Sequence, residues 1–395
     1  MRLVLALLFC AATARAASVP DAVAWAADTP PFDRALWFVL VEEEDGTVVH
    51  AENARALAIP ASVRKLFSAV TIAECLPLDG RLETELWQED EDLILKGGGD
   101  PSFGAERSGY FPEVTAFEPF LRALHARGVR RIRDVVADVS LFDRVTIPYQ
   151  WKIGNILSRY AAPADAVAWS ENVIGSYAVA SAGHLAGMAF HDALENAGIA
   201  VEGRVRVETE PREWSRRIAA APAPMTYDLL ATVLKPSHNL FAEMLYKRAS
   251  AGAEPASYDA SRELERRFLT TEVEIDETSF RFVDGSGLAP DDLVTPDAVV
   301  KLLRWMNHPA RRGVWWGLLP QPGAAEGTLR SRLLSVGDRL RAKTGTVAGV
   351  NALAGIIEGR EGGFRYFVVM VNHHIGSSAA ANRLIDSIVE AAADF

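Results

Sequence analysis

Ser62 and Lys65 are the first pair of residues whose types and spacing could support chemistry. They begin and end the stretch Ser62-Val63-Arg64-Lys65, at the start of a predicted helix. Residues three positions apart share one face of a helix, so the amine could reach the hydroxyl. A serine becomes an effective nucleophile when a base accepts its proton, and a helix N-terminus favours negative charge that develops nearby. The pattern is weak by itself, because a capping serine and a solvated lysine would give the same letters.

A second polar group is Ser237-His238-Asn239, between a predicted helix that ends near Lys235 and one that starts at Leu240. A serine and an asparagine in such a loop could relay a proton and hydrogen-bond a substrate amide. An ordinary helix cap would use the same residue types. His238 could act as a general base, but we assign the polar work to Ser237 and Asn239.

The third group is Lys343-Thr344-Gly345-Thr346, which runs into a predicted strand. A substrate backbone can dock along a strand edge, and Gly345 would allow close approach. The amides of Thr346 and Ser62 could together form an oxyanion hole. We expect the charge of Lys343 to lower the pKa of the Lys65 amine and make it a better base. The alternative is an ordinary exposed strand, but three such groups in this order are difficult to attribute to chance.

Strand and helix patterns at both ends of the chain must position these groups. Residues 36–41 and 47–49 are apolar runs joined by Glu43-Glu44-Asp45-Gly46, which predicts a β-hairpin. A helical pattern opens at Pro60-Ala61-Ser62. Two strands and a final helix are predicted near the other end, at residues 350–357, 364–371 and 379–392.

The middle of the chain, residues 83–222, has a different pattern. Short strands are predicted at residues 93–95, 135–139 and 201–207, and helices at residues 117–127 and 183–197. A proline-rich stretch, residues 220–224, then precedes an amphipathic helix at residues 227–234, as expected where the chain returns from an inserted domain. We therefore predict one domain from residues 17–82 and 223–395, with residues 83–222 inserted.

Composition restricts the class of protein. The chain has 395 residues, of which 49% are hydrophobic and 24% charged, which is typical of a globular protein large enough for two domains. The formal net charge of −11 argues against a protein that binds nucleic acid through its phosphates. We predict no nucleic-acid partner.

The N-terminus resembles an export signal. Arg2 precedes an apolar run over residues 3–12, and Ala14-Arg15-Ala16 places small residues at alternate positions. We predict a cleavable signal peptide over residues 1–16. The apolar run is too short to span a bilayer, and no longer one follows. The prediction is an exported protein without a transmembrane segment, periplasmic or extracellular, and soluble or loosely associated with the cell wall.

The three groups match the S-x-x-K, S-x-N and K-T-G motifs of the serine penicillin-binding proteins and β-lactamases. The chain most resembles the low-molecular-mass (class C) D-alanyl-D-alanine carboxypeptidase/endopeptidase family, which has a domain inserted after the first motif. The likeness extends to residues 95–101 (LKGGGDP) and 284–288 (DGSGL). His238 is a departure, because the family usually has Asp or Asn there. The resemblance implies an α/β (α+β) penicillin-binding/β-lactamase-like fold, an antiparallel sheet flanked by helices, with an inserted second domain.

The resemblance also implies a reaction. Ser62 would attack the carbonyl of a D-Ala-D-Ala bond with Lys65 as the base, and an acyl-enzyme would then be hydrolysed by water. Ser237 and Lys343 would pass the proton to the departing D-alanine. No metal or organic cofactor is implied.

Substrate contacts are implied in the same way. Asn239 would hold the acyl side chain, and Thr344, Gly345 and Thr346 would line the substrate strand, with the two threonines binding the terminal carboxylate. The implied partners are peptidoglycan peptides that end in D-alanine, with β-lactam antibiotics as covalent inhibitors.

Two other functions remain open at this point. A β-lactamase would share all three motifs but must hydrolyse its penicilloyl-enzyme rapidly, and no distinctive deacylating glutamate can be placed. A non-catalytic wall-binding module would tolerate loss of motif residues, yet the Ser, Lys, Asn, Thr and Gly positions are all present. We interpret Asp284-Gly285-Ser286-Gly287 as a tight turn near the active site rather than a second nucleophile.

Overall fold

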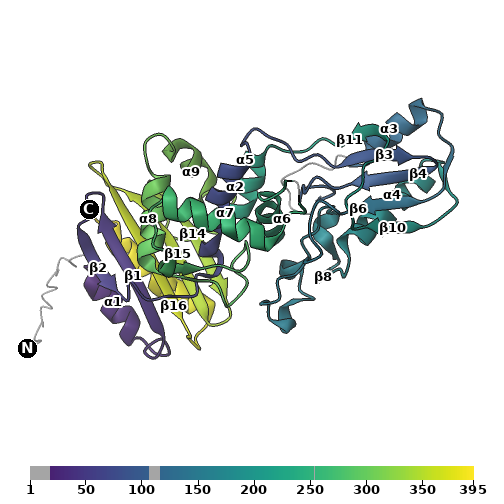
Figure 1. Cartoon of the computed structure of the whole chain (residues 1–395). Coiled ribbons are helices and arrows are strands. Elements are labelled where there is room, and N and C mark those ends of the chain that lie inside the picture. The colour runs from purple at the N-terminus through teal and green to yellow at the C-terminus, as the bar shows by residue number, and fades with distance from the viewer. Residues whose placement is uncertain (1–17, 106–115, 253) are drawn as a thin grey trace, which may run out of the picture.

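The computed structural model describes residues 18–105, 116–252 and 254–395. The predicted signal peptide, residues 1–16, lies outside the described residues. Figure 1 shows two lobes with helices between them. We call residues 18–82 and 223–395 the terminal lobe, and residues 83–222 the inserted lobe.

A five-stranded sheet forms the centre of the terminal lobe, in the order β14-β15-β16-β1-β2. All four neighbouring pairs are antiparallel. The strands are β1 (Leu36–Glu43), β2 (Val48–Glu52), β14 (Leu340–Val347), β15 (Val350–Glu358) and β16 (Phe364–Asn372). Because β1 pairs with both β2 and β16, segments from the two ends of the chain lie side by side. The predicted hairpin and antiparallel sheet are confirmed.

Both faces of this sheet are buried. Along β16, Val369 belongs to the core on one face and Val368 to the core on the other, as the two-residue period of a strand requires. The helices α1 (Val19–Asp28) and α10 (Ser378–Ala392) cover the first face and contact each other. Strands buried on both sides need apolar residues at nearly every position, which explains the continuous apolar runs in the sequence.

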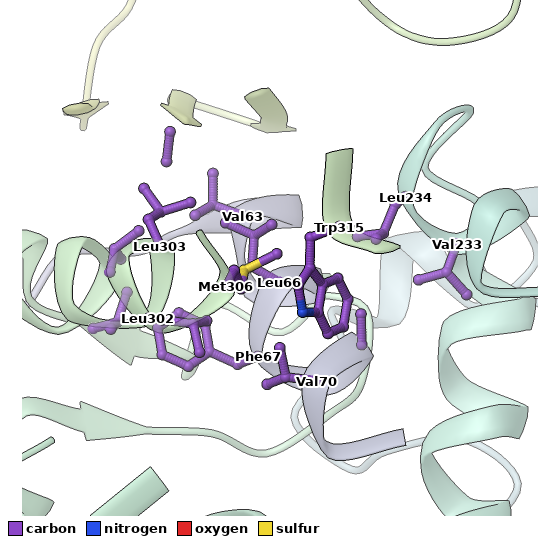
Figure 2. Packing of buried hydrophobic residues seen from close by; sticks show 14 of the residues in the cluster. Val63, Leu66, Phe67, Val70, Val233, Leu234, Leu302, Leu303, Met306 and Trp315 are labelled. Atoms are coloured by element: carbon purple, nitrogen blue, oxygen red, sulfur yellow. The ribbon is translucent and has the colours of Figure 1, made fainter. Parts of the chain in front are cut away.

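A group of helices covers the opposite face and supports the three motifs. They are α2 (Lys65–Cys75), α5 (Thr226–Leu234), α6 (Asn239–Arg248), α7 (Tyr258–Thr271), α8 (Pro296–Met306) and α9 (Arg312–Leu318). Figure 2 shows Leu66, Phe67 and Val70 of α2 in one cluster with apolar residues of α5, α8 and α9. Each fully buried side chain of this kind stabilises the fold by about 1.5–3 kcal/mol. The packing therefore fixes the position of the first turn of α2.

The inserted lobe has its own five-stranded sheet, in the order β10-β6-β4-β3-β11. Its strands are β3 (Glu85–Glu89), β4 (Asp92–Lys96), β6 (Val135–Asp138), β10 (Val205–Glu208) and β11 (Arg216–Ala220), and its helices are α3 (Glu118–Ala126) and α4 (Ala182–Asn196). The β4–β6 and β6–β10 pairs are parallel, and the other two are antiparallel.

The single strand predicted over residues 201–207 is wrong. The segment forms two short strands, β9 (Ala200–Val201) and β10, with Gly203 between them. At Gly203 a Cβ atom would lie 2.0 Å from Asp134 Oδ1 and 2.5 Å from the Arg133 carbonyl oxygen. The chain therefore crosses close to another backbone at this point, which interrupts the strand.

Helix α6 of the terminal lobe packs into the cores of both lobes. Leu240 and Met244 pack in the core of the inserted lobe, whereas Phe241 and Leu245 pack in the core of the terminal lobe. Residues four positions apart share one face of a helix, so α6 presents one apolar face to each core. Figure 1 shows this helix between the two lobes. The second motif, at its N-terminal end, therefore lies where the lobes meet.

We propose the domain boundaries 82/83 and 222/223, because the second sheet begins at Glu85 and ends at Ala220. Short paired segments complete the description: β5 (Arg131–Ile132), β7 (Val173–Ile174), β8 (Tyr177–Ala178), β12 (Phe280–Arg281) and β13 (Leu293–Val294). Among the described helices, none combines the length and apolar character needed to cross a bilayer.

Candidate active site

Ser62 lies on a single 3₁₀ turn, η1 (Ala61–Arg64), and Lys65 is the first residue of the helix α2 that follows. Lys65 Nζ is 2.9 Å from Ser62 Oγ. Lys65 Nζ also donates to Asn239 Oδ1 at 2.7 Å and to the carbonyl oxygen of Ser286 at 2.7 Å. The two other acceptors thus hold a fully buried amine against the hydroxyl that it would deprotonate.

Burial lowers the pKa of Lys65 from its usual value to about 7. The negative charges of Asp284 and Glu243 oppose this shift, and the positive charge of Arg64 adds to it. Burial, not the charge of Lys343, is the main cause, which corrects the expectation from the sequence. A substantial fraction of Lys65 is therefore neutral, and able to accept a proton, near pH 7.

Lys343 is the second buried amine at the site. Its Nζ donates to Ser237 Oγ at 2.8 Å and to the Thr344 carbonyl oxygen at 2.9 Å. Burial, together with the charge of Lys65, holds the pKa of Lys343 well below its usual value. Ser237 has a left-handed backbone conformation with φ of 65°, which is uncommon for a residue other than glycine. Such strain is found where the surrounding structure fixes a side chain for a function.

Asn239 is the first residue of α6, not a loop residue before a helix at Leu240. Its Oδ1 accepts from Lys65, and its Nδ2 donates to the Tyr160 carbonyl oxygen at 2.8 Å. Asn239 therefore connects the amine of the first motif to the inserted lobe.

The third motif lies on β14, which is an edge strand of the sheet. A Cβ atom at Gly345 would lie 2.6 Å from the Pro60 carbonyl oxygen and 3.1 Å from the Ser62 amide nitrogen. The backbone at residue 345 thus runs against the turn that carries Ser62, and a larger residue would separate them. Thr344 Oγ1 donates to Thr328 Oγ1 at 2.8 Å, and Thr346 Oγ1 accepts from Asn351 Nδ2 at 3.3 Å.

Two buried carboxylates, Glu243 of α6 and Asp284 of the turn at residues 284–287, support the position of Lys65. Glu243 accepts from the amides of Ser286 and Gly285 at 2.8 and 2.9 Å. Asp284 accepts from the indole nitrogen of Trp151 at 2.8 Å. Burial and the charge of Asp284 raise the pKa of Glu243 to about 7. This turn, predicted to lie near the active site, directs the Ser286 carbonyl at Lys65.

A cleft of about 400 Å³ opens in front of these groups. Five of the predicted site residues line it: Ser62, Ser237, Asn239, Thr344 and Thr346. Lys65 and Lys343 lie behind the surface of the cleft, fully buried. Within the described part of the chain, no group of three or more His, Cys, Asp or Glu residues is arranged to hold a metal ion.

Comparison with known families identifies the lineage of this arrangement. The model of the D-Ala-D-Ala carboxypeptidase 3 (S13) family matches residues 21–180 and 174–394, which is almost the whole chain. The chain belongs to the S13 family. The predicted family and the predicted class of enzyme, a serine-type D-Ala-D-Ala carboxypeptidase, are thereby confirmed.

Individual relatives agree with S13 membership. The D-alanyl-D-alanine carboxypeptidase of Actinomadura sp. (strain R39) is 27% identical, over 87% of this chain and 78% of the relative. Carboxypeptidase DacB of Mycolicibacterium smegmatis is 28% identical, over 85% of this chain and 75% of the relative. Penicillin binding protein 4 of Haemophilus influenzae has a similar fold, with a TM-score of 0.83 at 19% identity, covering 94% of this chain and 99% of that structure. The predicted fold class is confirmed.

Part of the S13 cleft was not predicted from the sequence. Lys152, Asn155 and Tyr160 of the inserted lobe line it, as does Thr328 of the terminal lobe. None of the four belongs to one of the three motifs, and the three from the inserted lobe reach the cleft only through the way the lobes pack. The one sequence signal for this part of the cleft was the predicted turn, because Gly287 and Leu288 at its end also line the cleft.

Proposed function

We propose that this S13 protein is a serine D-alanyl-D-alanine carboxypeptidase that trims peptidoglycan stem peptides through an acyl-enzyme on Ser62. The observation that carries the proposal is the 2.9 Å contact between Ser62 Oγ and Lys65 Nζ, where the pKa of the amine is about 7. A buried base of this pKa can activate a serine at neutral pH.

Acylation starts with transfer of the Ser62 proton to neutral Lys65. The Ser62 oxygen attacks the carbonyl carbon of the penultimate D-alanine, and the amides of Ser62 and Thr346 stabilise the oxyanion. Asn239 supports this step in two ways. It accepts a hydrogen bond from Lys65, and it lines the cleft that would receive the acyl side chain.

Departure of the terminal D-alanine requires a proton on its nitrogen. Ser237 and Lys343, 2.8 Å apart, form the relay that delivers it. The C–N bond breaks, D-alanine leaves as a neutral amine, and the acyl group stays on Ser62 as an ester. A water molecule then attacks the ester carbonyl, and the bond between this carbon and Ser62 Oγ breaks. Ser62 takes up a proton from the water, and the shortened peptide leaves with the water oxygen in its new carboxyl group.

Substrate alignment is the role we give to β14. An extended peptide would add to this edge strand, with Gly345 at the point of closest approach and the hydroxyls of Thr344 and Thr346 at the terminal carboxylate. β-Lactams would acylate Ser62 at the same place. The structure of the Haemophilus influenzae penicillin binding protein 4 in complex with a β-lactam supports this part of the proposal.

Two measurements on the purified protein test the proposal. A stem pentapeptide ending in D-Ala-D-Ala should lose one D-alanine, and a cross-linked dimer assayed in parallel measures any endopeptidase activity. Intact mass followed over time with benzylpenicillin should show a persistent adduct that is missing in Ser62→Ala. Rapid hydrolysis of the penicillin would indicate a β-lactamase instead, and no reaction with either compound would indicate a binding module.

We also propose export to the periplasm or the cell exterior, because the predicted signal over residues 1–16 and the activity on cell-wall peptides point to the same compartment. Fractionation of cells that make the full chain tests this. The protein should appear in the periplasmic or culture fraction with its N-terminus shortened, and retention in washed membranes until detergent is added would contradict the proposal.

A further inference from the structure

His238, the departure from the family motif, faces a buried carboxylate of the inserted lobe. Its Nε2 lies 3.5 Å from Glu171 Oε2. The Glu171 side chain is only 2% exposed, and the same oxygen, Oε2, accepts a hydrogen bond from Arg159 Nη2 at 2.5 Å. Burial by itself would raise the pKa of Glu171, but hydrogen bonds from His238 and Arg159 outweigh it and lower the pKa to about 2. Glu171 is therefore a carboxylate at neutral pH.

The backbone that presents Glu171 is unusual. Ser170, Glu171 and Asn172 have φ values of 49°, 57° and 56°, three left-handed residues in succession without a glycine. Side-chain contacts hold this turn in place. Asn172 Nδ2 donates to the Pro163 carbonyl oxygen at 2.8 Å, and Trp169 stacks on Phe117 with ring centroids 4.3 Å apart. Strain that persists because neighbours enforce it is a sign of a functional position.

The same part of the inserted lobe touches the second motif at another point. Tyr160, which follows Arg159, accepts through its carbonyl oxygen from Asn239 Nδ2 at 2.8 Å. The motif is thus bound on both sides of its N-terminal turn, by Glu171 at His238 and by Tyr160 at Asn239. Asn239 in turn accepts a hydrogen bond from Lys65. Loss of the contacts at Glu171 and Tyr160 would therefore displace a group that holds the base in place.

We propose that Glu171 and Arg159 are positioning residues for acylation, matched to His238, and that they hold Asn239 at its distance from Lys65. The contact with Glu171 explains why residue 238 is a histidine. An aspartate at position 238 would place a second carboxylate against buried Glu171. The inference rests on the proposed function, because acylation of Ser62 is the step it concerns.

The test is a double-mutant cycle on the rate of acylation by benzylpenicillin, measured by intact mass on the full mature protein. Glu171→Gln should slow acylation about threefold and His238→Asp about thirtyfold, because only the second change sets two carboxylates together. The combined variant should be about tenfold faster than His238→Asp, and so only about threefold slower than the wild type. Independent effects would make it about ninetyfold slower, and this thirtyfold difference corresponds to a coupling energy of about 2 kcal/mol. If the two changes were independent structural defects, removing the Glu171 carboxylate would not restore the acylation rate that His238→Asp loses.

Two controls complete the experiment. Glu210→Gln changes an exposed carboxylate of the same lobe and should leave the rate unchanged. His238→Asn, whose amide can still donate a hydrogen bond, should lie between the wild type and His238→Asp. Thermal unfolding of every variant shows whether the fold is retained.

An equal rate for His238→Asp and the wild type would overturn the inference, and so would a combined variant no faster than His238→Asp. If His238→Asp does not fold, Glu171→Gln decides by itself: slower acylation at an unchanged melting temperature supports the inference, and an unchanged rate overturns it. Wild-type protein that benzylpenicillin does not acylate would contradict the proposed function itself, so the two failures are distinguishable.

Discussion

At the scale of single residues, the site depends on an amine that is neutral where most lysines are charged. Lys65 reaches this state by burial, and it retains three hydrogen-bond partners that fix its direction. Replacing it with alanine should slow acylation by at least about 10²-fold, the lower range for loss of a general base. The rate of benzylpenicillin adduct formation measures this effect. Lys301→Ala, which changes an exposed lysine, should have no effect.

The pH dependence of acylation follows from the same amine. Acylation needs neutral Lys65, so its rate should rise with pH, pass its midpoint near the pKa of about 7, and level off at higher pH. A rate that is flat between pH 5.5 and 9 would show that another group is the base. The profile is measured by stopping the reaction with acid at each pH and counting adduct by mass.

Glu243 offers a test of the electrostatics behind Lys65. Its carboxylate raises the pKa of Lys65 against the effect of burial, so Glu243→Gln should lower that pKa and move the midpoint of the acylation profile to lower pH. The change also removes one acceptor from the amides of Ser286 and Gly285, so a slower plateau is expected. A midpoint that moves to higher pH would contradict the assignment.

At the scale of elements, the distance between β14 and the Ser62 turn depends on Gly345. A Cβ atom there would press on the backbone at Pro60 and Ser62, so Gly345→Ala must separate the two elements. A displacement of about 1 Å can cost about 10²-fold in rate, and we expect a loss of this size in acylation. Gly313→Ala, in open space on α9, is the matched control and should retain full activity.

Elements that depend on local patterns were predictable from the sequence. Strands β15 and β16 consist mostly of apolar residues, and helix α10 has apolar residues at helical spacing, so all three were found. The parallel pairing of β4 with β6, and of β6 with β10, was not predictable, because each pair joins strands that are separated by a helix and loops. The same distinction applies to the site. The motif residues are marked by their spacing, whereas Lys152 and Tyr160 reach the cleft only through lobe packing.

At the scale of the whole molecule, α6 makes the two lobes depend on each other. Met244 lies fully buried in the core of the inserted lobe, although α6 itself belongs to the terminal lobe. Met244→Ala should lower the free energy of unfolding by about 2–5 kcal/mol, and the melting transition should remain single because α6 contributes to both cores. Calorimetry measures this. Met188→Ala, at a position 40% exposed, should cost much less, and two separated transitions would contradict the coupling.

The pairing of β1 with β16 has a consequence for biosynthesis. Strand β1 is made early and has its second neighbour only when residues 364–372 exist, so the sheet that carries Lys343 cannot close on a nascent chain that lacks its last segment. The inserted lobe has no such dependence for its sheet, whose strands all lie between Glu85 and Ala220. Folding would therefore begin in the middle of the chain, and the reactive serine would acquire its base, its relay and its substrate edge together, only after residues 364–372 have been made.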